Sequence, residues 1–148
     1  MTVERLQETA TACAERHGAH LIDLGFRGER GTRVVEVFVD AEEGITTDLC
    51  AEISRDLLAD IENRGLVEGA FRLDVSSPGI QRPLKFPWQY RKHIGRALQV
   101  RIEGEAAPAT GILRSADEDG ILLETEKGKE TRKIPFAQLV EARVKAPW

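Results

Sequence analysis

The chain changes character within one short segment, Leu73-Asp-Val-Ser-Ser-Pro-Gly-Ile-Gln-Arg-Pro-Leu84. An alternating strand pattern leads there into a Pro-Gly turn and an Arg-Pro pair. Pro78, Pro83 and Pro87 each fix their own backbone φ and favour an extended conformation in the preceding residue. Because a linker of this composition is semi-rigid, the segment predicts a stiffened joint between two small domains.

The residues before the joint predict an α+β domain over residues 1–83. Apolar residues recur at helical spacing in two stretches that end at Gly18 and Gly65, and Thr47 is the expected N-cap of the second helix. Alternating apolar residues predict three strands, at Ile22–Phe26, Val35–Val39 and Phe71–Val75, the first two joined through a turn at Gly28–Gly31. This order favours a sandwich of two helices on one face of a three-stranded sheet.

The residues after the joint, 84–148, predict an all-β domain. Five short strand patterns follow Gly95 within about 55 residues, with Asp119-Gly120 as the strongest hairpin signal. Closing such a sheet removes its exposed edges, so the pattern favours a small barrel.

The two predicted domains differ in charge. Residues 1–83 hold 9 arginines, no lysine and 16 acidic residues, a net charge of −7, whereas residues 84–148 carry +3. The acidic domain repels polyanions and suits a basic protein partner. No apolar run approaches the roughly 20 residues that cross a membrane, and charges occupy the place of a signal peptide's apolar region, so we expect a cytoplasmic protein.

No constellation of catalytic residues is apparent. His17, His20 and His93 have no carboxylate or cysteine at a metal-ligand spacing. Ser76 and Ser77 precede a turn but do not form a nucleophile elbow, and we expect them to hydrogen-bond the turn backbone. The sequence therefore predicts no catalytic residue, no metal and no cofactor.

The stretch Lys85-Phe-Pro-Trp-Gln-Tyr-Arg-Lys-His93 interleaves cations with aromatic rings, a mixture that stacks on bases and contacts phosphates. The alternative is that the rings pack the domain junction while the cations are solvated. Arg82 either bridges acidic groups through its planar guanidinium or reaches outward to a partner. The candidate partner-binding residues are Ser76, Ser77, Pro78, Gly79, Arg82, Pro83, Lys85, Trp88, Tyr90, Arg91 and Lys92.

Over nearly its whole length the chain resembles the ribosome maturation factor RimP family. The strongest anchor is Leu73–Gly79 followed by Arg82-Pro-Leu84, and the other anchors are Arg33–Asp40, Glu43-Gly-Ile45, the helix start at Asp48–Ser54, and Tyr90 with the strand after Gly95. Ile80 and Gln81 depart from the family pattern, in which leucine and often aspartate are expected.

The resemblance implies an SH3-like or Sm-like barrel after the α+β domain, binding to the free small (30S) ribosomal subunit during late assembly, and no enzymatic activity. We expect a monomer whose acidic domain faces a basic ribosomal protein near the decoding region. The barrel and the aromatic-basic stretch would face 16S ribosomal RNA or the same protein. The alternative is a general RNA-binding module acting on messenger or small RNA.

Overall fold

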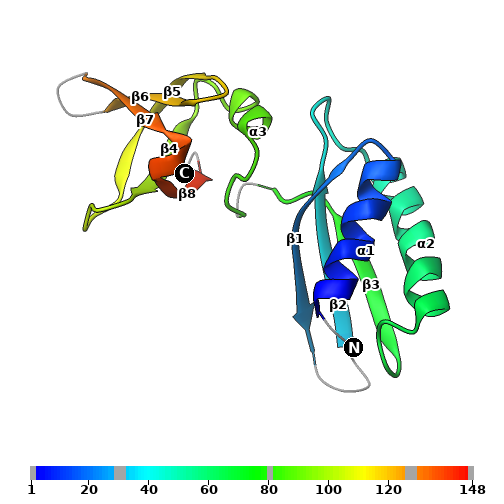
Figure 1. Cartoon of the computed structure of the whole chain (residues 1–148). Coiled ribbons are helices and arrows are strands. Elements are labelled where there is room, and N and C mark those ends of the chain that lie inside the picture. The colour runs from blue at the N-terminus through cyan, green and yellow to red at the C-terminus, as the bar shows by residue number, and fades with distance from the viewer. Residues whose placement is uncertain (1–2, 29–32, 80–81, 126–129, 147–148) are drawn as a thin grey trace. The chain divides into compact units, whose positions relative to one another are not determined.

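The computed structural model describes residues 3–28, 33–79, 82–125 and 130–146. The chain forms two compact units, Met1–Pro78 and Gly79–Trp148 (Figure 1). The boundary falls at the Pro-Gly pair of the predicted joint, before the division that was expected after residue 83. Ile80, Gln81 and most of the turn expected at Gly28–Gly31 lie outside the described residues.

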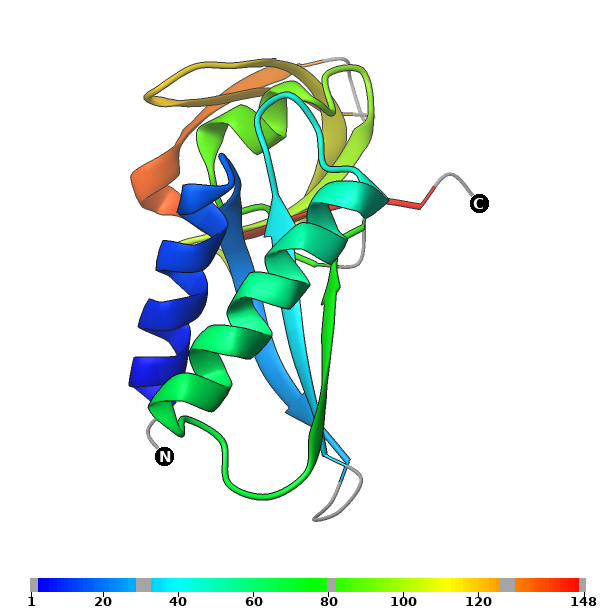
Figure 2. The same cartoon turned by 90° about the vertical axis from the view of Figure 1, so that its right-hand side faces the viewer.

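The first unit has the predicted order of elements. These are α1 (Val3–Arg16), β1 (His20–Arg27), β2 (Arg33–Asp40), α2 (Thr47–Arg64) and β3 (Phe71–Ser76). The sheet order is β1-β2-β3, with β1 antiparallel and β3 parallel to β2. Parallel neighbours need a crossover, which α2 supplies. Both helices cover the same face of the sheet, as predicted (Figures 1 and 2).

The core of the first unit lies between this sheet and its two helices. Leu6, Ala10 and Cys13 face it from α1, and Ile53 and Leu57 face it from α2, at the spacing of one helical face. Cys50 also lies in this core, and both cysteines are unpaired. Burial raises the pKa of each thiol, because an apolar environment disfavours the thiolate.

Two details of the first unit differ from the expected pattern. A β-bulge lies between Leu21 and Asp23, so the strict alternation predicted from Ile22 is broken. An extra residue in one strand shifts the side-chain alternation, and Leu21 and Leu24 are therefore the residues of this strand that contact the core. In α2, the apolar Leu58 lies beside the buried Leu57 but is itself 37% exposed.

The ends of α2 show which residues cap the helix. Thr46, not Thr47, is the N-cap: its backbone is extended and its hydroxyl accepts a hydrogen bond from the Leu49 amide at 3.1 Å. Thr47 is the first helical residue, and Asp48 lies in the first turn, where a negative charge suits the helix dipole. Gly65 ends the helix, as predicted, and its backbone is left-handed.

The second unit consists mainly of one antiparallel sheet in the order β7-β6-β5-β4-β8. Its strands are β4 (Ala97–Ile102), β5 (Ala109–Ala116), β6 (Gly120–Thr125), β7 (Thr131–Pro135) and β8 (Leu139–Val144), with the 3-10 turn η1 (Phe136–Gln138) before β8. The prediction of five short strands is confirmed. A short helix, α3 (Pro87–Arg91), was not predicted, although proline suits the first position of a helix.

The core of the second unit follows the alternation of its strands. Leu98, Val100 and Ile102 of β4 are buried, and Gln99 and Arg101 between them are exposed. The hairpin expected at Asp119-Gly120 joins β5 to β6, and the amides of Gly120 and Asp119 donate to Asp117, which lowers the pKa of that carboxyl. Gly120 itself is required by packing, because a Cβ there would lie 2.3 Å from the Ile134 carbonyl oxygen.

The cap of α2 gives a matched pair of variants. Replacing the N-cap Thr46→Ala removes the acceptor for an orphan helix amide, and we expect a loss of about 1 kcal/mol in unfolding free energy. Thr47→Ala should change it by less than about 0.5 kcal/mol, as expected for a surface substitution. Urea unfolding followed by helical circular dichroism reports this unit, because its two helices contain most of the helical residues. Equal losses in both variants would contradict the assignment of the cap.

Candidate partner-binding surface

The joint begins where β3 ends. Ser76 is the last residue of β3, and Ser76 and Ser77 are both exposed. Gly79 has a φ of 62°, the positive value that its Pro-Gly turn predicted. After it, Arg82 and Pro83 belong to the second unit and line a groove there with residues of β4 and β8.

The aromatic-basic stretch is held in shape by Gln89, a residue that sequence analysis did not select. Gln89 is 1% exposed, and its Oε1 accepts hydrogen bonds from the amides of Lys85 at 2.7 Å and Phe86 at 2.9 Å. Phe86 is the N-cap of α3, and a glutamine at the third helical position commonly reaches back to such an amide. The position of Gln89 three residues after Phe86 was the feature of the sequence that could have indicated this role.

Four side chains of this stretch form a compact cation–π cluster. The rings of Phe86 and Trp88 stack at a centroid distance of 5.6 Å and an interplanar angle of 8°. The Nζ of Lys85 lies 5.5 Å from the Phe86 ring, and the Nζ of Lys92 lies 4.9 Å from the Trp88 ring. These distances fall within the range of cation–π attraction. Arg91 follows Tyr90 in α3 and is exposed.

Tyr90 is placed differently from its expected role. It is 4% exposed and lies in the core of the second unit, where its ring meets Phe136 at a centroid distance of 5.1 Å. Burial raises the pKa of Tyr90 to about 12. We therefore correct the expectation that Tyr90 contacts a partner and assign the ring to packing.

The first unit carries its charges mostly on exposed side chains. It holds 8 arginines against 16 acidic residues, a net charge of −8, and several of these arginines are paired within the unit. Arg27 lies 3.6 Å from Glu36 and 3.4 Å from Asp74, linking the three strands across the sheet. Such exposed pairs add little to the stability of the fold. The carboxylates in excess over the arginines determine the negative electrostatic potential of this unit.

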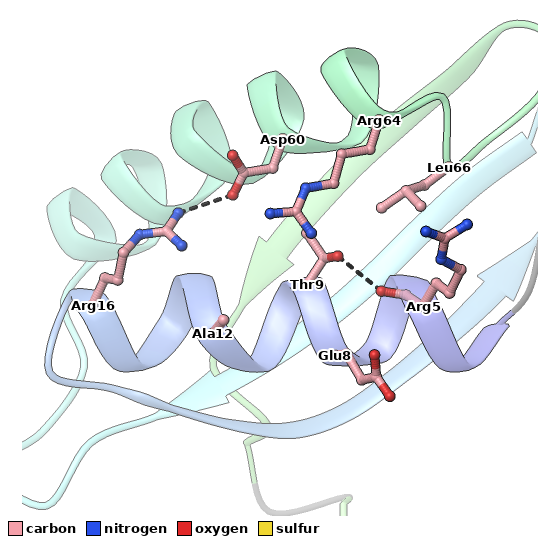
Figure 3. A pocket seen from close by; sticks show the side chains of 8 residues that line it. All are labelled: Arg5, Glu8, Thr9, Ala12, Arg16, Asp60, Arg64 and Leu66. Carbon is pink, nitrogen blue, oxygen red and sulfur yellow. Dashed lines mark hydrogen bonds and ion pairs between the residues drawn. The ribbon is translucent and has the colours of Figure 1, made fainter.

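A pocket of about 190 Å³ lies between α1 and α2 (Figure 3). Arg5, Arg16 and Arg64 line it together with the carboxylates Glu8 and Asp60, so its charges nearly balance. Arg16 donates to Asp60 at 2.9 Å across the two helices, as Figure 3 shows. The pocket is therefore a space between two helices that the ion pair of Arg16 and Asp60 bridges.

His17 adds a polar contact to the packing of α1 against α2. The Nε2 of His17, the residue after α1, lies 2.6 Å from a carboxylate oxygen of Asp56 in α2, which gives this histidine a structural role. Within the described residues, no group of three or more His, Cys, Asp or Glu side chains could hold a metal ion. None of the described helices combines the length and the apolar character needed to cross a membrane.

The buried amide of Gln89 gives a prediction for the aromatic-basic stretch. Gln89→Met keeps the length of the side chain but leaves two amides without their acceptor, and we expect a loss of about 1–3 kcal/mol in unfolding free energy. Gln138→Met, at an exposed position, is the control and should change it by less than about 0.5 kcal/mol. Tryptophan fluorescence during urea unfolding is the measurement, since both tryptophans belong to the second unit. A normal midpoint for Gln89→Met would contradict this role.

Tyr90 is the one tyrosine of the chain, so phenolate absorbance reports it alone. In the folded protein the titration midpoint should lie at about 12, against about 10 when unfolded. Because folding raises this pKa, the stabilisation is complete below pH about 10 and is lost as the pH rises through about 12. Tyr90→Phe should abolish both the absorbance change and this loss of stability. A midpoint near 10 in the folded protein would place the ring at the surface.

Comparison with known proteins finds similarity to one family. Residues 9–81 match the family described as the RimP N-terminal domain. A relative from Chlorobium chlorochromatii (strain CaD3), named ribosome maturation factor RimP, is 37% identical over 109 residues. This alignment covers 70% of the chain and 60% of the Chlorobium protein, so the chain spans less than two thirds of that relative. Through its amino-terminal domain, the chain belongs to the RimP family of ribosome maturation factors.

Proposed function

We propose that this protein is a non-catalytic assembly factor that binds the free small (30S) ribosomal subunit and promotes its maturation in the cytoplasm. The observation that carries the proposal is the match of residues 9–81 to the RimP amino-terminal domain, together with the similarity to a protein named as a ribosome maturation factor. We further propose that the five-stranded sheet of the second unit is the SH3-like barrel of the family.

The opposite charges of the two units support a partner of mixed composition. The first unit carries −8 and the second +4, counting 13 arginines and lysines against 9 acidic residues in the second. A ribosomal subunit offers both kinds of surface, because basic proteins lie within a polyanionic RNA. Complementary charge raises the rate of association and orients the two partners more than it raises their affinity. In this proposal the acidic unit faces a basic ribosomal protein near the decoding region, and the second unit faces 16S ribosomal RNA.

Within the second unit, the proposed contacts are the exposed cations near α3. Lys85, Arg91 and Lys92 are exposed, and Trp88 lies beneath Lys92 in the cation–π cluster. The residues Ser76, Ser77, Pro78, Gly79, Arg82 and Pro83 remain proposed contacts of the joint. The buried Tyr90 is not among them.

A second candidate function is a general RNA-binding module for messenger or small RNA. The cation–π cluster favours it, because stacked rings beside cations are the usual platform for single-stranded nucleic acid. The two functions differ in what the protein binds when subunits are absent.

Sedimentation of a cell lysate that contains the tagged protein tests the proposal. We expect the protein to co-sediment with free 30S particles and not with 70S ribosomes, and cells that lack it should accumulate immature small subunits. Tagged protein found only with messenger or small RNA, with normal subunit levels in the deletion strain, would support the second candidate and sink the first.

A further inference from the structure

The second unit contains a cationic groove of about 590 Å³ that is separate from the cation–π cluster. Its charged lining consists of Arg82 from the joint and Arg143 and Lys145 from the carboxyl-terminal segment. Gln99 of β4 is the neutral polar group, and Pro83, Val144 and Ala146 supply the apolar part. All of these residues belong to one unit.

Backbone pairing brings these residues together. Gln99 of β4 lies directly opposite Arg143 of β8 in the antiparallel register, so both side chains project from the same face of the sheet. The Lys145 amide donates to the Ala97 carbonyl at 2.8 Å and extends this pairing beyond the end of β8. On the joint, the Leu84 amide donates to the Ala142 carbonyl at 2.8 Å. The groove is therefore built on a hydrogen-bonded scaffold.

The composition of the groove selects an anion. No carboxylate is among its lining residues, in contrast to the pocket between α1 and α2, where Glu8 and Asp60 accompany the arginines. Arg143 is oriented from outside the groove by Glu141, which accepts from its Nη2 at 2.7 Å and its Nε at 3.1 Å. The side chain of Lys145 makes no ion pair with any described residue. A positive charge thus remains for a ligand.

The volume of about 590 Å³ and the three cations of the lining fit a polymer of phosphates rather than a single small anion. Two guanidinium groups and one ammonium group match phosphate oxygens, because guanidinium binds them in a bidentate manner and ammonium binds as a point charge. Apolar atoms of the half-buried Pro83 offer contact for a sugar ring. The stacked Phe86 and Trp88 lie a few residues further along the same chain, and stacking platforms beside cationic grooves are typical of single-strand binders.

We propose that this groove binds the sugar-phosphate backbone of RNA, with Arg82, Arg143 and Lys145 as the phosphate contacts. That the RNA belongs to the small ribosomal subunit rests on the proposed function. The phosphate chemistry of the groove stands on its lining residues. The contact positions RNA without reading its sequence, because phosphates carry no base identity.

The test compares Lys145→Gln with Lys133→Gln in the full chain. Lys133 lies in β7, at the opposite end of the sheet order from β8, so both variants remove one lysine charge from the same unit. The probe is a short fluorescently labelled single-stranded RNA of mixed sequence, titrated over a range of salt concentrations. Tryptophan fluorescence during urea unfolding confirms that both variants fold, as expected for exposed side chains.

We expect Lys145→Gln to weaken binding about fivefold at 0.1 M salt, the contribution of one phosphate contact on a single strand, and to reduce the salt slope by about 0.7. Lys133→Gln should weaken binding less than about twofold, because only the long-range field changes. Arg143→Gln should act in the same direction as Lys145→Gln. Equal losses in the two lysine variants, or no RNA binding by the unmodified protein, would overturn the groove as an RNA site.

Two further measurements separate this inference from the proposed function. If poly-L-glutamate competes as well as RNA of equal charge, the groove takes an acidic protein and the RNA assignment is overturned. If RNA binding depends on Lys145 but the protein does not co-sediment with 30S particles, the groove is upheld and the proposed function fails. If the protein co-sediments with 30S particles and Lys145→Gln changes neither subunit nor RNA binding, the function stands and the groove fails.

Discussion

The hydrogen bond from the Leu84 amide to the Ala142 carbonyl is the constraint on which the second half of the joint depends. It attaches the chain after Pro83 to β8, the edge strand of the five-stranded sheet. With this bond in place, Arg82 and Pro83 line the same groove as Arg143. The next hydrogen bonds along the chain, from Lys85 and Phe86 to Gln89, continue the attachment into α3. Backbone pairing therefore attaches the segment after Pro83 to the second unit, whereas the stiffness of the whole joint remains a prediction from its prolines.

The two units differ in how their charged side chains are placed. In the first unit, arginines are paired with carboxylates across strands and helices, and the remaining carboxylates define an acidic surface. The second unit also pairs arginines with carboxylates, but it places Lys85 and Lys92 over aromatic rings and has a groove whose lining contains no carboxylate. Salt screens exposed charges in both units. These charges therefore affect the rate of association with a partner more than the free energy of folding.

Most of the fold could be predicted because the relevant signals are local. The periodicity of α2, its end at Gly65 and the alternation of Leu98, Val100 and Ile102 depend on neighbours in the chain, and the structure confirms them. The N-cap was misassigned to Thr47 because two threonines stand side by side and only backbone geometry distinguishes them. The bulge in β1 depends on pairing with β2, which the alternation of one strand does not contain. The same holds for the burial of Tyr90 against Phe136, a contact between distant residues.

The candidate site was predictable in its residue types but not in its arrangement. The cations and aromatic rings between Lys85 and Lys92 are visible in the sequence. The burial of Gln89 is not, because glutamine is usually a surface residue. Arg143 and Lys145 carry no motif, and only the register of β4 and β8 brings them to the groove that Arg82 lines. Sites assembled from long-range pairing are the ones that a linear pattern misses.

The two cysteines of the first unit have a practical consequence. Cys13 and Cys50 are both buried there, with thiol pKa values raised by burial, and the second unit has no cysteine. A thiol reacts as the thiolate, so burial slows the alkylation of both groups, and Cys13, at 0% exposed, meets a reagent only when the helices of this unit separate from the sheet. The rate of alkylation therefore reports the opening of the first unit alone. A partner bound to the first unit would slow this reaction, because binding to the folded unit makes its opening less frequent.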